Sequence, residues 1–372
     1  MLDLALALGC ALLGVHLLSI ILAWRKCSPR RIAPATDQLR VSLVRPICGL
    51  EFKLEETLQS SFAQNYHDYE IIFCVAHADD AALSVVRRLI ATHHTIQTRI
   101  LIGEINLSQN PKLNNMASAW PEASGDVVIF ADSNLLLPPD YCSSIAGAFE
   151  KINTVVVSSP PVGDFAESFF GEVECAMLNT HAARWQFAAS AMGINFAQGK
   201  TLAFRRSAFD DNLMYELGQE PAEDAAATKI VRSMGRVLNV LAPPYTHPVG
   251  QRTARSFWSR HVRWARLRRA TFPAVFALEA GCGVFPALLA FAISPTLSAY
   301  PLALVAIATI GVWYGAEFIL ARALGWRANV WFIPACLMRD ALLPAFYVAA
   351  WISARFEWRG RAMDSASRPA AT

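Results

Sequence analysis

Charged residues are scarce in this chain. Asp, Glu, Lys and Arg together make up 17% of its 372 residues, while hydrophobic residues make up 54%. That balance is too apolar for an ordinary soluble protein of this size. The formal net charge of +3 is too small to indicate a nucleic-acid partner. We therefore expect a membrane protein that does not bind nucleic acid.

Paired cysteines are also absent. None of the eight cysteines belongs to a CxxC pair, and two or three of them fall in apolar stretches. This pattern argues against a zinc site and against a disulfide framework. We expect the cysteines to be reduced and mostly buried.

The first long hydrophobic run covers residues 2–24. It is close to the ~20 residues that a helix needs to cross a bilayer. No basic region precedes the run, and Arg25, Lys26, Arg30 and Arg31 follow it. This arrangement favours a retained anchor over a secretory signal peptide, and it places the C-terminal end of the anchor in the cytoplasm.

More apolar segments lie in the last third of the chain. Residues 251–271 mix Arg with Trp, as expected of a helix that lies in the membrane interface. Residues 272–293 and 300–320 are apolar enough to span the membrane. Residues 331–351 contain adjacent Arg and Asp residues, which are costly inside a bilayer, so we expect a broken or re-entrant segment there.

Four short segments separated by helical stretches are typical of buried strands: residues 41–45, 69–75, 98–102 and 127–132. This alternation predicts an α/β domain with a mainly parallel sheet, in which ligands collect at the C-terminal ends of the strands. The whole chain then divides into an N-terminal anchor, an α/β domain, an interfacial helix, C-terminal membrane segments and a basic cytoplasmic tail. These parts cover residues 1–24, 40–250, 251–271, 272–353 and 354–372.

One acidic candidate is Asp132, which follows a hydrophobic strand and precedes Ser133 and Asn134. A divalent cation that holds a diphosphate needs hard oxygen ligands and keeps positions open for phosphate and water. A carboxylate at a strand end meets part of that need. Asp132 could equally cap the turn that follows, as Asp commonly does.

A second candidate is the segment Glu-Pro-Ala-Glu-Asp-Ala at residues 220–225, which leads into a helical stretch at residues 226–234. Asp224 could act as a general base for an attacking hydroxyl, held rigidly at the start of a helix. The alternative is that its charge only complements the helix dipole.

Basic residues supply the third set of candidates. Arg260 and Arg263 share a helix face with Trp264, and guanidinium groups bind a diphosphate well; the same arginines could instead meet lipid phosphates. Lys112, at a helix start beyond the third strand, either neutralises phosphate or is a solvated surface charge. Two aspartates that follow the second strand, Asp79 and Asp80, could bind a nucleotide or cap a helix.

Taken in order, these segments resemble the ceramide glucosyltransferase family of inverting enzymes with the GT-A fold. The similar stretch runs from about residue 41 to residue 271. The segments that carry the resemblance are Arg45-Pro46 with Gly49, residues 110–115, Asp132-Ser133, residues 222–224 and residues 260–264.

The resemblance implies a GT-A-like nucleotide-sugar-binding domain, with Mg²⁺ or Mn²⁺ on Asp132 and Asp224 as the catalytic base. It implies donor binding by Asp79, Asp80, Lys112, Asp132, Ser133, Arg260, Arg263 and Trp264. It also places His181 and Glu223 on the acceptor side.

This chain departs from the family at two points. His77 stands where animal members have an acidic residue, and Asn134 replaces a small residue. No DxD triplet is present, so Asp132 is expected to be the only protein carboxylate on the metal.

We therefore expect an integral membrane enzyme of the bacterial inner membrane with a cytoplasmic catalytic domain. It would transfer a sugar, glucose in the first place, from a UDP-sugar to a hydroxyl of a membrane lipid, with ceramide favoured. The main alternative is N-acetylglucosamine transfer to a hopanoid alcohol. A processive polysaccharide synthase would need more spans, and a non-catalytic membrane scaffold would not depend on Asp132 and Asp224.

Overall fold

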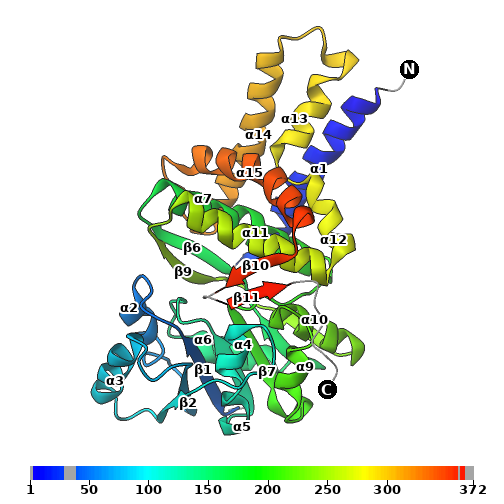
Figure 1. The fold of residues 1–372 in the computed structure, drawn as a ribbon. Helices are drawn as coiled ribbons and strands as arrows, with labels where there is room; N and C mark the ends of the chain where they lie inside the picture. Colours follow the sequence, from blue (N-terminus) through cyan, green and yellow to red (C-terminus); the bar gives the residue numbers. More distant parts are fainter. Residues whose placement is uncertain (1–2, 29–38, 359–360, 365–372) are drawn as a thin grey trace. The chain divides into compact units, whose positions relative to one another are not determined.

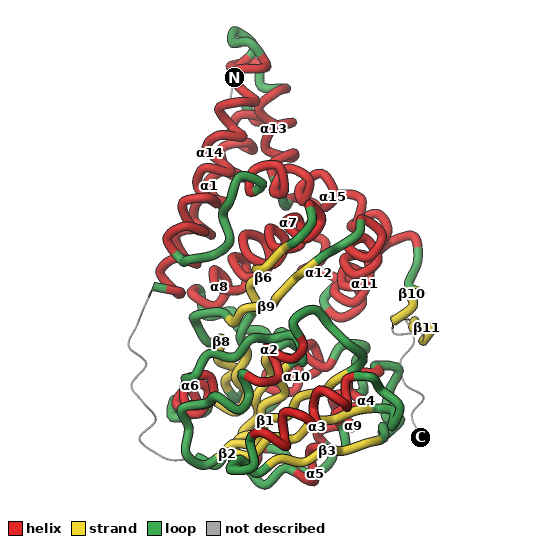
Figure 2. The backbone as a smooth tube through the Cα atoms, turned by 90° about the vertical axis from the view of Figure 1, so that its left-hand side faces the viewer, coloured by secondary structure: helices red, strands yellow, loops and turns green. Residues whose placement is uncertain are grey.

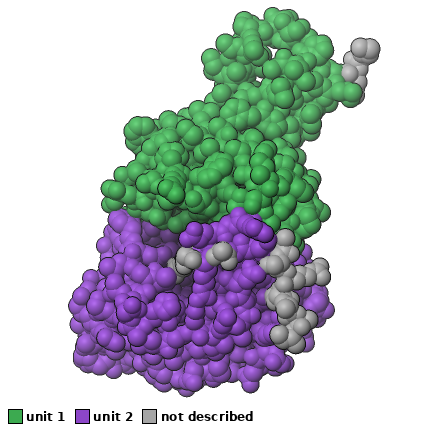
Figure 3. Space-filling view, viewed as in Figure 1, with its two compact units in different colours: residues 1–28, 162–194, 249–354 green, residues 29–161, 195–248, 355–372 purple. Residues whose placement is uncertain are grey.

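The computed structural model describes residues 3–28, 39–358 and 361–364, so Arg30 and Arg31 of the basic cluster lie outside the described residues. The chain forms two compact units (Figure 3). We call one the membrane unit; it comprises Met1–Ser28, Val162–Ile194 and Val249–Ala354. The other, the sheet unit, comprises Pro29–Pro161, Asn195–Pro248 and Arg355–Thr372.

The sheet unit contains a seven-stranded sheet with the order β3-β2-β1-β4-β7-β5-β8. The four predicted strands form its first half and are parallel to one another. They are β1 (Val41–Ile47), β2 (Tyr69–Val75), β3 (Thr98–Ile102) and β4 (Val127–Ala131). Their C-terminal ends therefore meet at one edge of the sheet, where ligands are expected.

The other half of the sheet is mixed. β7 (Thr201–Arg205) runs antiparallel to both β4 and β5 (Thr154–Ser158), and β8 (Val237–Val240) is parallel to β5. Because β7 is antiparallel to β4, its first residue pairs with Ala131, the last residue of β4. The start of β7 thus lies beside the C-terminal end of β4.

Helices cover both faces of this sheet (Figure 2). On one face Leu43 packs against the apolar side of α6, and Ile71 packs against α2 and α3. On the other face Phe130, Phe204 and Trp120 of α5 stack edge to face. The helices are α2 (Leu54–Gln59), α3 (Ala82–Thr92), α4 (Pro111–Met116), α5 (Ala119–Glu122), α6 (Tyr141–Ala148), α9 (Leu213–Leu217) and α10 (Glu223–Ser233), with a 3-10 turn η2 (Arg206–Ala208).

Two helix starts shape the candidate site. α4 begins at Pro111, and the side chain of Asn110 caps it by accepting hydrogen bonds from the amides of Lys112 and Leu113. α10 begins at Glu223, three residues earlier than the sequence predicts, so Glu223 and Asp224 lie in its first turn. It ends just before Gly235, whose φ of 59° suits a glycine after a helix.

The membrane unit is helical. Its elements are α1 (Leu4–Cys27), α7 (Phe169–Ala176), the π-helix η1 (Met177–Ala183), α8 (Arg184–Ala191), α11 (Ala254–Thr271), α12 (Pro273–Leu278), η3 (Glu279–Gly281), α13 (Val284–Ala292), η4 (Pro295–Leu297), α14 (Leu302–Ala323) and α15 (Phe332–Ile352). α1, α13 and α14 lie side by side, whereas α15 packs with α7 and α11 (Figures 1 and 2). Two short sheets complete the fold: β6 (Pro161–Ala166) pairs with β9 (Tyr245–Gly250), and β10 (Arg355–Trp358) pairs with β11 (Arg361–Asp364).

Three described helices, α1, α14 and α15, are long and apolar enough to cross a membrane, and the bent pair α12–η3 with α13 would make a fourth span. They support a membrane protein, as the composition predicts. The domain boundary differs from the expected one. Residues 162–194, which we expected within the α/β domain, belong to the membrane unit because α8 packs against α1 and α7 packs against α15.

The expected break in residues 331–351 is wrong. α15 is continuous from Phe332 to Ile352, and the break lies instead between η3 and α13, where the helix axis bends by 50°. The charged pair does not interrupt α15 because it is satisfied inside the protein. Arg339 bonds Glu317 of α14 at 3.0 Å, and Asp340 accepts from the amide of Val284 at 2.9 Å.

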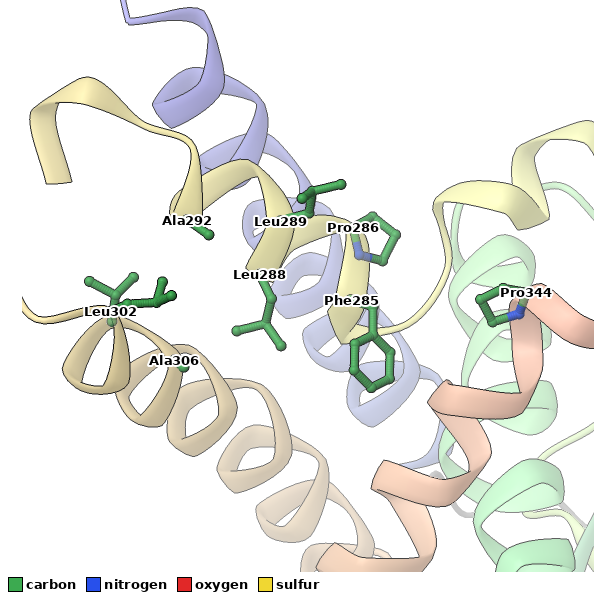
Figure 4. A pocket seen from close by; sticks show the side chains of 9 residues that line it. Phe285, Pro286, Leu288, Leu289, Ala292, Leu302, Ala306 and Pro344 are labelled. Carbon is green, nitrogen blue, oxygen red and sulfur yellow. The ribbon is translucent and has the colours of Figure 1, made fainter. Parts of the chain in front are cut away.

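An apolar hollow of about 610 Å³ lies between α13 and α14 (Figure 4). Phe285, Leu289, Leu302, Ala306 and Pro344 are among the residues that line it. No residue of the predicted site lines this hollow, so the chemistry has to be sought at the edge of the sheet.

A buried carboxylate ties the parallel strands together. Glu70 of β2 accepts hydrogen bonds from Ser42 of β1 (2.6 Å), from Ser124 before β4 (2.6 Å) and from Arg99 of β3 (2.7 Å). Burial alone would raise the pKa of Glu70, but the bonds from Ser124 and Ser42 lower it to about 2. The carboxylate is therefore ionised and paired at neutral pH.

We expect Glu70→Gln to lower the free energy of unfolding by about 2 kcal/mol, because the neutral amide loses the charged hydrogen bonds that Ser42, Ser124 and Arg99 donate to the carboxylate. The matched control is Glu55→Gln, whose exposed pair with Arg88 contributes below about 1 kcal/mol. Thermal unfolding of the purified protein in detergent compares the two variants. Equal shifts of the melting temperature would contradict the role given to Glu70.

Candidate active site

Asp132 stands directly after β4, with each carboxylate oxygen beside a lysine. Its Oδ1 lies 2.8 Å from Lys112 Nζ, and its Oδ2 lies 3.3 Å from Lys200 Nζ. Burial opposes ionisation of this carboxyl, but the two ammonium groups outweigh that effect and hold its pKa well below the usual range. Asp132 is therefore a fixed negative charge at the C-terminal edge of the sheet.

Lys112 is not a solvated surface charge. Its side chain is 15% exposed, and besides Asp132 its ammonium contacts Glu223 Oε1 at 2.8 Å and the carbonyl oxygen of Gly199 at 2.5 Å. Asn110 adds a hydrogen bond to the other oxygen of Glu223, at 2.7 Å. The starts of α4 and α10 are thus joined, and three of the predicted site residues, Lys112, Asp132 and Glu223, lie together.

Asp224 occupies the first turn of α10. Its Oδ2 accepts from the amide of Gly199 at 3.0 Å, and its Oδ1 accepts from the amide of Ala225 at 2.8 Å. Burial, followed by the negative charge of Glu223, raises the pKa of Asp224 to about 6, although Lys112 partly opposes this rise. A carboxylate with a pKa near 6 is suited to take up a proton close to neutral pH.

The dipeptide Gly199-Lys200 links the two candidate carboxylates. The carbonyl of Lys200 accepts from the amide of Asp132 at 3.0 Å, while the amide of Gly199 bonds Asp224. A Cβ at Gly199 would lie 2.7 Å from Glu223 Oε1, so a larger residue would disturb the contact. Asp132 and Asp224 therefore both contact one short segment, while their catalytic roles remain predictions.

Two further side chains at this edge are not among the residues that the sequence predicts for the site. Glu51, after β1, accepts from Ser133 Oγ at 2.8 Å and from Asn134 Nδ2 at 3.1 Å. Lys200 donates to Asn134 Oδ1 at 2.5 Å. A signal for Glu51 was present, because it follows the C-terminal end of a predicted parallel strand. No such signal existed for Lys200, whose place depends on the antiparallel pairing of β7.

The two aspartates after β2 lie in different surroundings. Asp80 accepts from the amides of Gly49 at 2.9 Å and of Ala82 at 2.8 Å, so it ties the loop after β1 to the start of α3. This is the capping alternative considered for it. Asp79 is exposed. Donor binding by either residue remains a prediction.

Metal binding would have to centre on Asp132. In the described part of the chain, no group of three His, Cys, Asp or Glu side chains could hold a metal ion by itself. An ion on Asp132 would take its other ligands from phosphate oxygens and water, which suits Mg²⁺ or Mn²⁺ with a bound diphosphate. The residues present fit such an ion only if it displaces at least one of the two ammonium groups.

The remaining basic candidates belong to the membrane unit. On α11, Arg260 lies 6.0 Å from the ring centre of Trp264, which confirms that these two share a face. Glu174 of α7 bonds His261 at 2.8 Å and lies 3.5 Å from Arg260. Arg263 is half-buried. Their expected roles toward the donor remain predictions.

His181 lies in the π-helix η1 of the same unit. Its neighbour Thr180 accepts from Arg339 at 2.7 Å, and Asn179 bonds the backbone of Gly163 at 2.6 Å. Burial, and then the charges of Arg339 and Arg184, keep the pKa of His181 well below 6.5, so its ring is neutral. Single π-turns are frequent at functional sites.

A family model covers nearly the whole chain: Glycosyl transferase family 21 matches residues 5–371. The chain belongs to this family. The family membership confirms the resemblance to ceramide glucosyltransferases that the motifs at Asp132, Asp224 and residues 260–264 indicate.

Among the relatives of this family 21 member is Ceramide glucosyltransferase 1 of Caenorhabditis elegans. It is 29% identical over 278 residues, which is 73% of this chain and 59% of that protein. Ceramide glucosyltransferase 3 of the same organism is 24% identical over 330 residues, 86% of this chain and 71% of that protein. The matched part of this chain thus corresponds to only about three fifths of the first of these relatives.

A solved structure has a similar fold. Mannosyltransferase PcManGT from Pyrobaculum calidifontis, in complex with GDP-Man and Mn²⁺, superimposes with a TM-score of 0.52 at 21% identity. The match covers 94% of this chain and 98% of that chain. It confirms the expected GT-A-like α/β fold of the family 21 chain.

Proposed function

We propose that this chain is an inverting glycosyltransferase that moves glucose from a UDP-sugar to the hydroxyl of a membrane lipid, ceramide in the first place. The observation that carries the proposal is the convergence of Asp132 and Asp224 on Gly199-Lys200. One is a permanently charged carboxylate and the other is a carboxylate with a pKa of about 6. Family membership and the names of the two worm relatives support the reaction and the acceptor.

The two carboxylates suit opposite ends of a displacement reaction. Asp224 takes the proton of the acceptor hydroxyl as that oxygen forms its bond to the anomeric carbon of the sugar. The bond from this carbon to the diphosphate breaks, and UDP leaves with the electron pair, so a single displacement inverts the anomeric centre. Because Asp224 is held at both of its oxygens, it is orientated before the acceptor arrives.

The donor end is organised around Asp132. A magnesium or manganese ion on Asp132 would supply charge neutralisation for the diphosphate, and the Pyrobaculum calidifontis mannosyltransferase of similar fold is a Mn²⁺ complex. Lys112 contributes a second positive charge, fixed by Asp132, Glu223 and Gly199. We assign Asp79, Asp80, Ser133, Arg260, Arg263 and Trp264 to donor binding and His181 and Glu223 to the acceptor side.

The C-terminal hairpin supports a proposal for the membrane topology of the chain. β10 and β11 belong to the sheet unit, where Arg361 pairs with Glu104 and the amide of Asp364 donates to Gln109 at 3.1 Å. The hairpin then lies on the same side of the membrane as the rest of the sheet unit, so residues 249–354 cross an even number of times. We infer that the bent pair α12–η3 with α13 crosses once, that α14 crosses once and that α15 does not cross.

This membrane topology agrees with the positive-inside rule. Basic residues follow α1 and occur in the hairpin, at Arg355 and Arg361, and such residues favour the cytoplasm. α15 packs mainly against α7 and α11 (Figure 1), and this packing fits a helix that does not span. We place the sheet unit in the cytoplasm, at the bacterial inner membrane.

A direct assay tests the reaction. Purified protein is incubated with UDP-glucose, UDP-galactose and UDP-N-acetylglucosamine against ceramide, diacylglycerol and a hopanoid alcohol, each with and without EDTA. We expect glucosylceramide as the main product, and we expect its formation to stop under chelation and to return with added Mg²⁺ or Mn²⁺. Product with hopanoid alcohol alone would replace the proposed acceptor, and undiminished turnover in EDTA would remove the metal.

The pH dependence tests the base. Because Asp224 acts in its ionised form, kcat/KM should rise with pH through a midpoint at about 6, the pKa of this carboxyl, and level off once the carboxyl is fully ionised. Glu223→Gln removes the negative charge that raises this pKa, so the midpoint of the rise should move to lower pH. A midpoint that does not move would show that another group controls the profile.

Two carboxylate variants distinguish an enzyme from a non-catalytic membrane scaffold. Asp224→Asn should lower turnover by ~10²–10⁴-fold while UDP binding is largely kept. Asp211→Asn, at an exposed carboxylate of the same unit, should leave turnover unchanged. Normal turnover by Asp224→Asn would exclude this residue as the base.

Threading is tested with two epitope tags, one after Thr372 and one beside Ile152, an exposed residue of the sheet unit. We expect protease added to inside-out bacterial membrane vesicles to remove both tags and protease added to intact spheroplasts to remove neither. Tags that are cleaved from opposite sides would show that α15 crosses the membrane.

A further inference from the structure

Lys200 lies in the candidate site, yet the mechanism above does not use it. Its ammonium is 3.3 Å from Asp132 Oδ2 and 2.5 Å from Asn134 Oδ1, and its side chain is 13% exposed. A charge so far removed from water is costly unless anionic or polar groups surround it. The fold therefore places a second, largely desolvated cation beside Asp132, in addition to Lys112.

The two lysines are held differently. Lys112, in α4, contacts the carboxylates of Asp132 and of Glu223 in α10 at 2.8 Å each. It also contacts the carbonyl oxygen of Gly199 at 2.5 Å. Lys200 makes a longer contact with Asp132, at 3.3 Å. The ammonium of Lys200 is thus the one farther from Asp132, and a divalent ion that binds Asp132 Oδ2 would take the place of this ammonium. Its flexible four-carbon stem lets it move to a nearby anion.

Asn134 supports this movement. Its Oδ1 accepts from Lys200, while its Nδ2 is fixed by Glu51 at 3.1 Å and its backbone carbonyl accepts from His247 at 2.8 Å. The amide is therefore anchored and keeps the lysine at the strand edge after the contact with Asp132 is lost.

We propose that Lys200 is a donor-binding residue whose ammonium leaves Asp132 for the diphosphate of the sugar nucleotide when donor and divalent ion bind, with Asn134 as its positioning residue. The proposal rests on the proposed use of a nucleotide sugar. The incoming ion replaces Lys200 as the counter-charge of Asp132, and the diphosphate replaces Asp132 as the counter-charge of Lys200. No charge is left unpaired in the exchange.

The test measures binding of UDP in the presence of Mg²⁺ by calorimetry, and donor kinetics where turnover is present. Lys200→Met should weaken UDP binding by roughly 10–100-fold, the usual contribution of a charged hydrogen bond, and should lower kcat/KM for the donor without changing KM for the lipid. Lys200→Arg should recover most of the loss. Lys229→Met, at a more exposed ion pair on α10, should bind UDP like the unaltered protein.

Other results of the same measurements would overturn the proposal. If Lys200 only occupies the ion site, Lys200→Met will bind UDP normally and will need less Mg²⁺ for half-maximal activity, which overturns the proposal. Asn134→Ala provides a second variant should Lys200→Met unfold, and an unchanged UDP affinity in it would overturn the role of Asn134. Binding without lipid turnover in the unaltered protein would overturn the proposed acceptor alone, whereas no UDP binding at all would overturn both proposals.

Discussion

The candidate site depends on one buried cation. The ammonium of Lys112 lies between the carboxylates of Asp132 and Glu223 and beneath the carbonyl of Gly199, so it joins the end of β4 to the starts of α4 and α10. Two carboxylates could not be held this close at the sheet edge without such a charge between them. Lys112 and Lys200 outweigh burial and lower the pKa of Asp132, whereas burial and then the charge of Glu223 raise the pKa of Asp224 against the effect of Lys112.

A similar rule governs the membrane unit, where each buried charge has a partner. Arg339 contacts Glu317 and Asp340, and Asp340 accepts from Tyr314 at 3.0 Å and from the amide of Val284. These bonds connect α14, α15 and the start of α13. Charges that would break a helix exposed to lipid therefore act here as links between helices, because the apolar surroundings make every unpaired alternative costly.

Much of the architecture could be predicted from local sequence. The four parallel strands, the helices after them, the first hydrophobic helix and the basic helix α11 all follow from hydrophobic periodicity and caps, which are short-range properties. The location of the candidate site at the strand ends could also be predicted, since Asp132 follows a run of buried residues. The sequence predicts the start of α10 three residues too late, because the residue before the helix, Ala222, has no side chain that could cap it.

Sequence alone determined which residue types are available: a strand-end carboxylate, an acidic helix start, a lysine after a capping asparagine, and helices apolar enough for a membrane. Tertiary structure decided which of them meet. Lys200 reaches Asp132 only because β7 runs antiparallel to β4, and α15 remains unbroken only because Glu317 lies opposite Arg339. Both depend on contacts between residues distant in the chain, and the free energy of such contacts is not encoded in any local pattern.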